Sequence, residues 1–284
     1  MPKKLIITEK PSVAMEFAKV LKINSNRKNG YIESDDWIIT WCVGHLVTMS
    51  YPEIYDEKLK FWRLDTLPFI PHEWKYEIIP AVQNQFNIVK NLLQREDVEE
   101  IYNAGDSGRE GEYIQRLVFM MAKPNPKAQI KRVWIDSQTE EEIRRGIKEA
   151  KDESEYDSLS DSAYLRAKED YLIGINFSRL LSIIYGRRVA KEINEEKASI
   201  SIGRVMTCVL GMVVSREREI RNFVKTKYYK IIGEFGNEEG TFKAEWKVNE
   251  KSQMFESNKL YNESGFKKEE DAKEFIKNLA EKKA

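Results

Sequence analysis

The chain has 284 residues, 41% hydrophobic and 33% charged, which is typical of a globular protein with room for two domains or slightly more. Lys and Arg total 47, as do Asp and Glu, so the zero net charge gives no sign of a nucleic-acid partner. The sequence contains no run of about 18 apolar residues, which is the length needed to span a bilayer. The start of the chain also lacks the apolar stretch of a signal peptide. Cys42 and Cys208 fit no metal-ligand pattern, which favours a reduced cytoplasm.

Strand and helix patterns alternate over the first half of the chain. An apolar run over Lys3–Thr8 predicts a buried strand, and Ser12 is expected to cap the helix that follows it. The next predicted elements are a strand over Trp37–Val43, an irregular segment over Tyr51–Pro80, a helix over Val82–Leu93, a strand at Ile101–Tyr102, a helix over Arg109–Met121, a strand over Ile130–Ile135 and a helix capped by Ser137. Such alternation is typical of a parallel α/β sheet.

The second half of the chain has a different pattern. Residues 153–221 are predicted to be helical, Lys227–Trp246 to form strands, and Phe266–Ala284 to form one amphipathic helix. The expected domains are therefore an α/β domain over 1–152, a helical domain over 153–223 and the start of a β-rich domain over 224–284. Residues 161–230 carry 14 Lys and Arg against 8 Asp and Glu, which suggests an anionic partner, although chance clustering of surface charge would look the same.

Acidic side chains follow two of the predicted strands. Glu9 comes directly after the first strand, and Asp106 and Glu110 follow the strand at Ile101–Tyr102. Because the carboxyl ends of parallel strands meet at one crevice, we expect Glu9 and Asp106 to face each other there. Carboxylates that share a crevice need a cation between them, and Mg²⁺ prefers such oxygen ligands. Acids at the start of a helix also favour its dipole, so the residues alone leave a simply capped helix as the alternative.

Two strings identify a candidate family for this crevice. LIITEKPSVA (residues 5–14) and NAGDSGREGEYI (residues 103–114) resemble the Toprim domain of type IA DNA topoisomerases of the topoisomerase III kind. The resemblance implies a Rossmann-like, mostly parallel α/β fold for residues 1–152. It also implies a helical domain and the start of a β-rich arch domain after it.

The resemblance assigns roles to the acidic residues. Glu9 matches the catalytic glutamate and Lys10 the lysine beside it, while Asp106 and Glu110 match the acids of an Asp-x-Asp-x-Glu motif. Glu9, Asp106 and Glu110 are therefore the expected Mg²⁺ ligands. Gly108 stands where many members have the second aspartate, so we expect a single Mg²⁺ that is bound weakly.

Three further strings resemble the same family: RAKEDYLIGINFSR (166–179), SIGRVMT (201–207) and WCVGHL (41–46). In that family the helical domain leads one DNA strand to the active site, and arginines there are suited to phosphate contacts. The implied DNA-binding residues are Arg166, Asn176, Arg179, Ser201, Ile202, Gly203, Arg204, Val205, Met206 and Thr207. Met206 replaces the usual glutamine of this pattern, and Cys208 replaces the usual proline.

The resemblance also implies an activity. Family members cleave one DNA strand through a tyrosine in a string like (S/T)YPRTD, pass another strand and reseal the break from a 5′-phosphotyrosine. This sequence contains no such string and no ATP-binding P-loop, so we expect a fragment that binds Mg²⁺ and single-stranded or underwound duplex DNA but does not relax plasmids. A monomer in the bacterial cytoplasm, on the nucleoid and not on a membrane, is expected.

Two other functions stay open from the sequence. A Toprim-type metal-dependent nuclease or primase would share Glu9 and the acidic string, although the strings at 166–179 and 201–207 argue against it. A non-catalytic DNA-binding or inhibitory module would keep the basic region and have no need of the metal.

Overall fold

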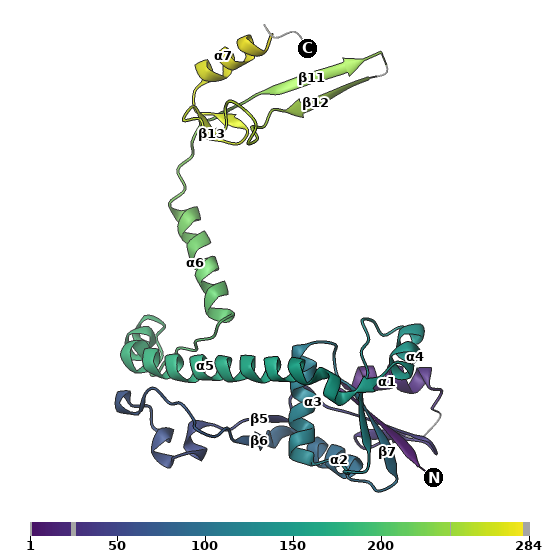
Figure 1. Ribbon diagram of the computed structural model, residues 1–284. Helices are drawn as coiled ribbons and strands as arrows, with labels where there is room; N and C mark the ends of the chain where they lie inside the picture. The colour runs from purple at the N-terminus through teal and green to yellow at the C-terminus, as the bar shows by residue number, and fades with distance from the viewer. Residues whose placement is uncertain (1, 24–26, 239, 281–284) are drawn as a thin grey trace. The chain divides into compact units, whose positions relative to one another are not determined.

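A computed structural model describes residues 2–23, 27–238 and 240–280 of the chain (Figure 1). The chain divides into two compact units, Met1–Val209 and Leu210–Ala284, and each is described by itself. Within the described ranges, no helix is both long enough and apolar enough to cross a membrane. The domain limits expected after residues 152 and 223 stay predictions.

The first unit follows the predicted alternation of strands and helices. Its elements are β1 (Lys3–Thr8), α1 (Pro11–Val20), β2 (Arg27–Lys28), β3 (Tyr31–Glu33), β4 (Trp37–Trp41), β5 (Val47–Met49), η1 (Pro52–Ile54), η2 (Glu57–Lys60), η3 (Leu64–Thr66), β6 (Tyr76–Ile78), η4 (Pro80–Val82), α2 (Gln83–Leu93), β7 (Val98–Ala104), α3 (Arg109–Ala122), β8 (Gln129–Arg132), α4 (Glu140–Lys148), β9 (Lys151–Asp152), η5 (Glu153–Tyr156) and α5 (Asp157–Glu192). The η elements are short 3₁₀ turns, and with β5 and β6 they make up the segment predicted to be irregular.

The main sheet of this unit is parallel at its centre. In the described part of the chain its strand order is β2-β3-β4-β1-β7-β8-β9. Strand β1 runs parallel to β4 and to β7, and β7 runs parallel to β8, while the outer pairs are antiparallel. Parallel neighbours need crossover connections, and helices α1, α2 and α3 lie in those connections. The predicted mostly parallel α/β fold is therefore confirmed.

Helices cover both faces of the sheet (Figure 1). Successive residues of a strand point to opposite faces, so Leu5 and Ile7 of β1 pack on one side with Phe86 of α2. Ile6, between them, packs on the other side with Phe17 of α1. Burial on both faces explains why the run at β1 is continuously apolar rather than alternating.

Strand β7 is longer than the sequence indicated. It begins at Val98 rather than Ile101, because the charged residue Glu100 finds partners on both neighbouring strands. Its carboxylate oxygens lie 2.9 Å from Lys4 Nζ and 2.5 Å from Lys131 Nζ. Cross-strand ion pairs of this kind let a polar residue occupy a central strand.

Both predicted helix caps were wrong. Lys10 rather than Ser12 stands at the N-cap of α1, and Pro11 takes the first helical position, where its missing N–H leaves no bond unmade. Helix α4 is capped by Thr139 rather than Ser137, with Thr139 Oγ1 accepting a hydrogen bond from the backbone N–H of Glu142.

Replacing Thr139 with alanine is expected to lower the free energy of unfolding by about 1 kcal/mol, because the first turn of α4 loses its side-chain acceptor. Urea unfolding followed by circular dichroism measures this loss. Ser137→Ala is the matched control and should change stability by less than about 0.5 kcal/mol. An equal loss in both variants would contradict the assignment of the cap.

The predicted helical region consists of two helices with an extended segment between them. Helix α5 ends at Glu192, α6 covers Met206–Arg221, and the residues between them are not helical. Asn194 follows α5 with a φ of 57°, and asparagine is one of the few residues that adopts this left-handed conformation readily.

The described part of the second unit contains most of α6, small antiparallel sheets and one further helix. Its elements after α6 are β10 (Tyr229–Lys230), β11 (Ile232–Asn237), β12 (Gly240–Glu245), β13 (Leu260–Asn262), β14 (Gly265–Phe266) and α7 (Glu269–Ala280). The strands expected over Lys227–Trp246 are confirmed. The helix expected from Phe266 begins three residues later, because Phe266 belongs to β14 and is fully buried against Ile231 and Ala272. The last predicted helical residues, 281–284, lie outside the described residues.

Candidate metal centre and nucleic-acid interface

The register of two parallel strands brings Glu9 and Asp106 together. Thr8 at the end of β1 lies beside Ala104 at the end of β7, so the residues that follow them leave the sheet at the same edge. Lys10 Nζ lies 3.4 Å from a Glu9 carboxylate oxygen and donates a 3.0 Å hydrogen bond to Asp106 Oδ2. The expectation that the two carboxylates face each other is confirmed by this shared ammonium.

The two carboxylates differ in their surroundings. Glu9 is only 8% exposed, and burial raises its pKa, with the nearby charge of Asp106 raising the pKa further. Lys10 acts in the opposite direction on Glu9, and its own pKa is raised mainly by the hydrogen bond to Asp106. A buried acid with a raised pKa beside an exposed carboxyl group is an arrangement suited to proton transfer.

Glu110 lies apart from this pair. Its Oε1 is 2.7 Å from His45 Nε2, and its side chain is 73% exposed. Across the described ranges, the His, Cys, Asp and Glu side chains form no group of three that could hold a metal ion. The structure therefore gathers two of the three expected ligands and pairs the third with His45. That histidine lies in the GHL string, which was the signal for it in the sequence.

The turn that presents Asp106 requires a close approach of backbone to backbone. A Cβ added to Gly111, in the first turn of α3, would lie 2.2 Å from the carbonyl oxygen of Asp106. Gly108, in contrast, has no atom within 4 Å of where its Cβ would be. Only a glycine therefore fits at 111, whereas the space beside 108 admits a side chain.

The donor set fits a hard divalent cation. Mg²⁺ in proteins commonly takes one or two carboxylates and completes its coordination with water and phosphate oxygens. Glu9 and Asp106 supply the carboxylates, and the Lys10 ammonium contacts both of them in the position between the two acids. Glu110 could join such a site only after it left His45.

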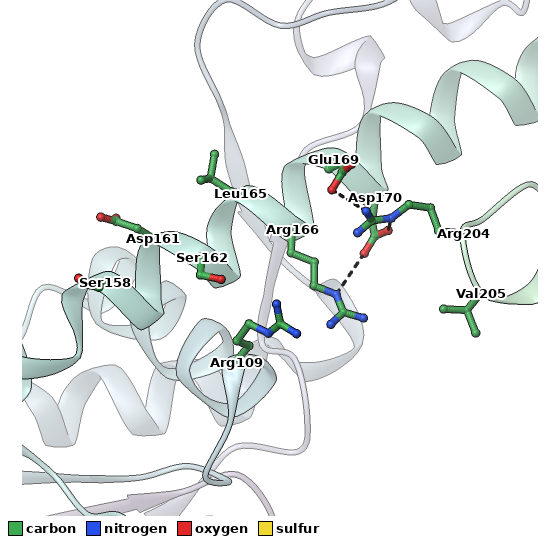
Figure 2. A pocket seen from close by; sticks show the side chains of 10 residues that line it. All are labelled: Arg109, Ser158, Asp161, Ser162, Leu165, Arg166, Glu169, Asp170, Arg204 and Val205. Atoms are coloured by element: carbon green, nitrogen blue, oxygen red, sulfur yellow. Dashed lines mark hydrogen bonds and ion pairs between the residues drawn. The ribbon is translucent and has the colours of Figure 1, made fainter.

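A cavity of about 790 Å³ lies along the N-terminal part of α5 (Figure 2). Arg109 and Arg166 extend into it, and Arg204 reaches it from the segment after α5. Arg204 is held by ion pairs of 2.5 Å to both Glu169 and Asp170. Asp161, Glu169 and Asp170 line the same cavity, so its lining is of mixed charge. Its arginines are the groups suited to the phosphates of a nucleic-acid strand.

Arg109 was missed in the sequence. It is the first residue of α3, directly after the turn that carries Asp106, and it lines a second hollow of about 550 Å³ as well. That hollow is also lined by His45, Glu110 and Arg166. It therefore adjoins both the turn that carries Asp106 (residues 103–108, the acidic turn) and the cavity along α5 that Arg109, Arg166 and Arg204 line (the arginine-lined cavity). The position of an arginine next to the acidic string was the available signal.

A row of small residues on α5 positions the segment that carries Arg204. Ser178 Oγ accepts a 2.8 Å hydrogen bond from Ile202 N, and Ser182 Oγ accepts one of 2.7 Å from Ile200 N. A Cβ on Gly186 would lie 2.7 Å from the carbonyl oxygen of Ala198, so the chain passes close there. The small residues Gly174, Ser178, Ser182 and Gly186 recur every fourth position, which places them on one face of the helix.

The remaining residues of the string at 201–207 lie just before α6 and in its first turn. The backbone N–H of Gly203 donates to Thr207 Oγ1 at 3.1 Å. Ser201, Val205 and Met206 are exposed, and Val205 lines the arginine-lined cavity.

Asn176 and Arg179 contact the irregular segment rather than an open surface. Asn176 pairs with both the N–H and the C=O of Phe69, at 2.6 and 2.8 Å. Arg179 is 3% exposed, donates to Leu59 O at 2.8 Å and lies 5.7 Å from the ring centroid of Trp62. Their polar groups therefore hold the loop on α5, which differs from the DNA contacts expected for them.

A buried ionic network lies under the acidic turn. Glu112 and Arg132 are fully buried and pair at 2.8 Å, and Arg116 lies 2.8 Å from Glu112 and 2.9 Å from Glu153. Burial raises the pKa of Glu153 from 4.5 to about 7, although Arg116 opposes that rise.

Glu153→Gln is expected to make the protein more stable than wild type at pH 8 and to lose that advantage by pH 5. A folded-state pKa above the unfolded one means that wild type loses stability as the pH rises from about 4.5 through about 7. Glutamine does not titrate, so at pH 8 the free energy of unfolding of Glu153→Gln can exceed that of wild type by about 3 kcal/mol. Urea unfolding at both pH values measures it, with the exposed Glu155→Gln as control. A difference that grows towards low pH would contradict the sign.

Comparisons with known proteins agree with the strings in the sequence. Residues 4–137 match the Toprim domain family, and residues 154–284 match a family described as DNA topoisomerase. The chain is similar to DNA topoisomerase 3 of Bacillus subtilis strain 168, at 40% identity over 231 residues, 81% of this chain and 30% of the relative. It is also similar to DNA topoisomerase 3 of Bacillus thuringiensis strain Al Hakam, at 39% identity over 261 residues, 92% of this chain and 34% of the relative. The chain thus spans about a third of the length of these relatives.

Proposed function

Because the chain belongs to the type IA DNA topoisomerase family and is topoisomerase III-like, we propose that it forms the metal- and strand-binding part of an ATP-independent topoisomerase. Such an enzyme cleaves one DNA strand, passes another through the break and reseals it. The observation that carries the proposal is the Glu9–Lys10–Asp106 cluster, since Gly108, two residues after Asp106, lines a hollow together with Arg109 and Arg166.

Asp106 and Glu9 are the proposed ligands of one Mg²⁺, with Glu110 as a further ligand if it turns from His45. The ion would position a DNA phosphate and offset its charge. Gly108 supplies no carboxylate, which supports a single weak site rather than two.

Glu9 and Lys10 are the proposed catalytic residues. Burial raises the pKa of Glu9, which makes its carboxylate a stronger base than a free one and suits it to give a proton to the 3′ oxygen that leaves during cleavage and to recover it on resealing. Lys10 provides a fixed positive charge 3.0 Å from Asp106, where it can stabilise the charge of a phosphate.

Arg109, Arg166 and Arg204 are the proposed phosphate contacts for the DNA strand, with Ser201, Ile202, Gly203, Val205, Met206 and Thr207 beside them. Contacts to phosphates carry no sequence information, so we expect binding that depends on salt rather than on base sequence. Underwound duplex DNA would bind where it exposes a single strand. Action as a monomer, in the cytoplasm and on the nucleoid, belongs to the same proposal.

The chain lacks the (S/T)YPRTD string of the nucleophile, so we propose that it binds DNA without relaxing it. The test is fluorescence anisotropy of a labelled single strand with the 284-residue chain, across salt and Mg²⁺ concentrations. We expect weak binding that weakens with salt, and Mg²⁺ binding by calorimetry that Asp106→Asn removes. Relaxation of a negatively supercoiled plasmid by the purified chain would contradict the proposal.

Two outcomes of the same assays would favour other functions. Mg²⁺-dependent nicking of DNA that Glu9→Gln abolishes would indicate a Toprim-type nuclease. Strand binding that ignores Mg²⁺, in a chain that binds no metal, would indicate a non-catalytic DNA-binding module.

A further inference from the structure

Arg132 is a fully buried arginine whose guanidinium faces the turn that carries Asp106. It is the last residue of β8, next to β7 in the sheet. Its Nη1 donates to the carbonyl oxygen of Gly105 at 2.8 Å, and its Nη2 donates to that of Asp106 at 2.9 Å. A weaker contact of 3.3 Å reaches the carbonyl oxygen of Asn103 at the end of the strand.

Two acceptors from consecutive peptide units of the acidic turn therefore share one guanidinium. A planar group with fixed N–H directions sets the orientation of the carbonyls that it binds. When the carbonyls of 105 and 106 are fixed, so is the direction in which the Asp106 side chain leaves the backbone. A core ion pair would have no need of these backbone contacts.

The guanidinium is itself held from the opposite side. Its Nε donates to Glu112 Oε2 at 2.8 Å, and the other carboxylate oxygen of Glu112 accepts from Arg116 Nε at 2.8 Å. Arg116 also donates to the carbonyl oxygen of Glu153 at 2.6 Å and to Asp157 Oδ1 at 2.9 Å. The network thus runs from the acidic turn to the first residue of α5, the helix that carries Arg166.

We propose that Arg132 is a positioning residue that orders the turn at residues 103–108 and so presents Asp106 to a divalent cation. The Glu112–Arg116 pairs fix that turn relative to the start of α5. The cation part of this inference rests on the proposed function, whereas the ordering of the turn does not.

The test is Arg132→Lys, which keeps the charge but not the planar set of donors. Hydrogen exchange measured by mass spectrometry should show the peptide over 103–108 exchanging at least tenfold faster, with the peptide over β4 much less affected. Calorimetry should show Mg²⁺ affinity at least tenfold weaker. Leu93→Ala is the control for lost stability alone, because it truncates a fully buried side chain at the end of α2.

Each outcome decides one part of the inference. Unchanged exchange over 103–108 in Arg132→Lys, or equal acceleration there in Leu93→Ala, would overturn the ordering of the turn. Faster exchange with unchanged Mg²⁺ affinity would overturn the link to the cation. A wild-type chain that binds no Mg²⁺ would count against the proposed function and the cation link, and the exchange data would still decide the ordering. If Arg132→Lys does not fold, Glu112→Asp gives the same comparison, because the shorter carboxylate draws the guanidinium away from the turn.

Discussion

Gly111→Ala is expected to lower the free energy of unfolding by about 3 kcal/mol and to weaken Mg²⁺ binding at least tenfold. The added Cβ would lie 2.2 Å from the carbonyl oxygen of Asp106 and 2.6 Å from its backbone nitrogen. Both are backbone atoms of the acidic turn, so the overlap can be relieved only by moving Asp106 or the start of α3. Urea unfolding and calorimetric titration with MgCl₂ measure the two effects.

Gly108→Ala is the matched control, since it adds the same methyl group three residues earlier into open space. It should leave Mg²⁺ binding within about twofold of wild type and change stability by less than about 1 kcal/mol. Wild-type metal affinity in Gly111→Ala would show that the turn tolerates displacement and would contradict the steric argument.

Gly108→Asp is expected to tighten Mg²⁺ binding at least tenfold. The substitution introduces the second aspartate that many members of the resembled family have at this position. The new carboxylate lies two residues from Asp106, and no atom lies within 4 Å of the added Cβ. Affinity of oxygen-ligand sites for divalent cations rises with the number of carboxylates. The same substitution should lower stability without metal, because three acids would then repel one another.

Calorimetry of Gly108→Asp and Gly108→Asn separates charge from side-chain size. The asparagine variant has a similar shape without the negative charge, and we expect it to gain much less affinity. Equal gains in both would indicate that the turn, rather than the added charge, limits metal binding in wild type.

The sequence was sufficient to predict the part of the site that lies at the carboxyl ends of the strands. The alternation of strand and helix patterns predicted a parallel sheet, and parallel strands bring Glu9 and Asp106 to one edge whatever their separation in sequence. The helix caps were wrong by a few residues, since Ser12 and Ser137 look as suitable as the residues that precede α1 and α4.

Contacts that depend on the packing of distant segments could not be predicted. The Glu110 carboxylate pairs with the imidazole of His45, which lies in a turn 65 residues earlier. Asn176 and Arg179 match a DNA-binding string, but the segment over 51–80 packs on α5, and their side chains donate hydrogen bonds to its backbone carbonyls. No helix or strand periodicity in that segment indicates where it packs.

The ladder between β1 and β7 also fixes the spacing of the strand ends that carry the two carboxylates. Adjacent strands lie about 4.8 Å apart, a length set by backbone hydrogen bonds and shared by all sheets. Thr8 beside Ala104 is the last pair of that ladder, so the strand ends from which Glu9 and Asp106 leave the sheet keep this spacing, while Asp106 itself can still move with its turn. The backbone therefore sets the distance between the two strand ends, and the side chains of the two acids make up the rest of the distance to a bound cation. Substitutions that alter this site then act through the turn, where an added Cβ at position 108 has no atom within 4 Å.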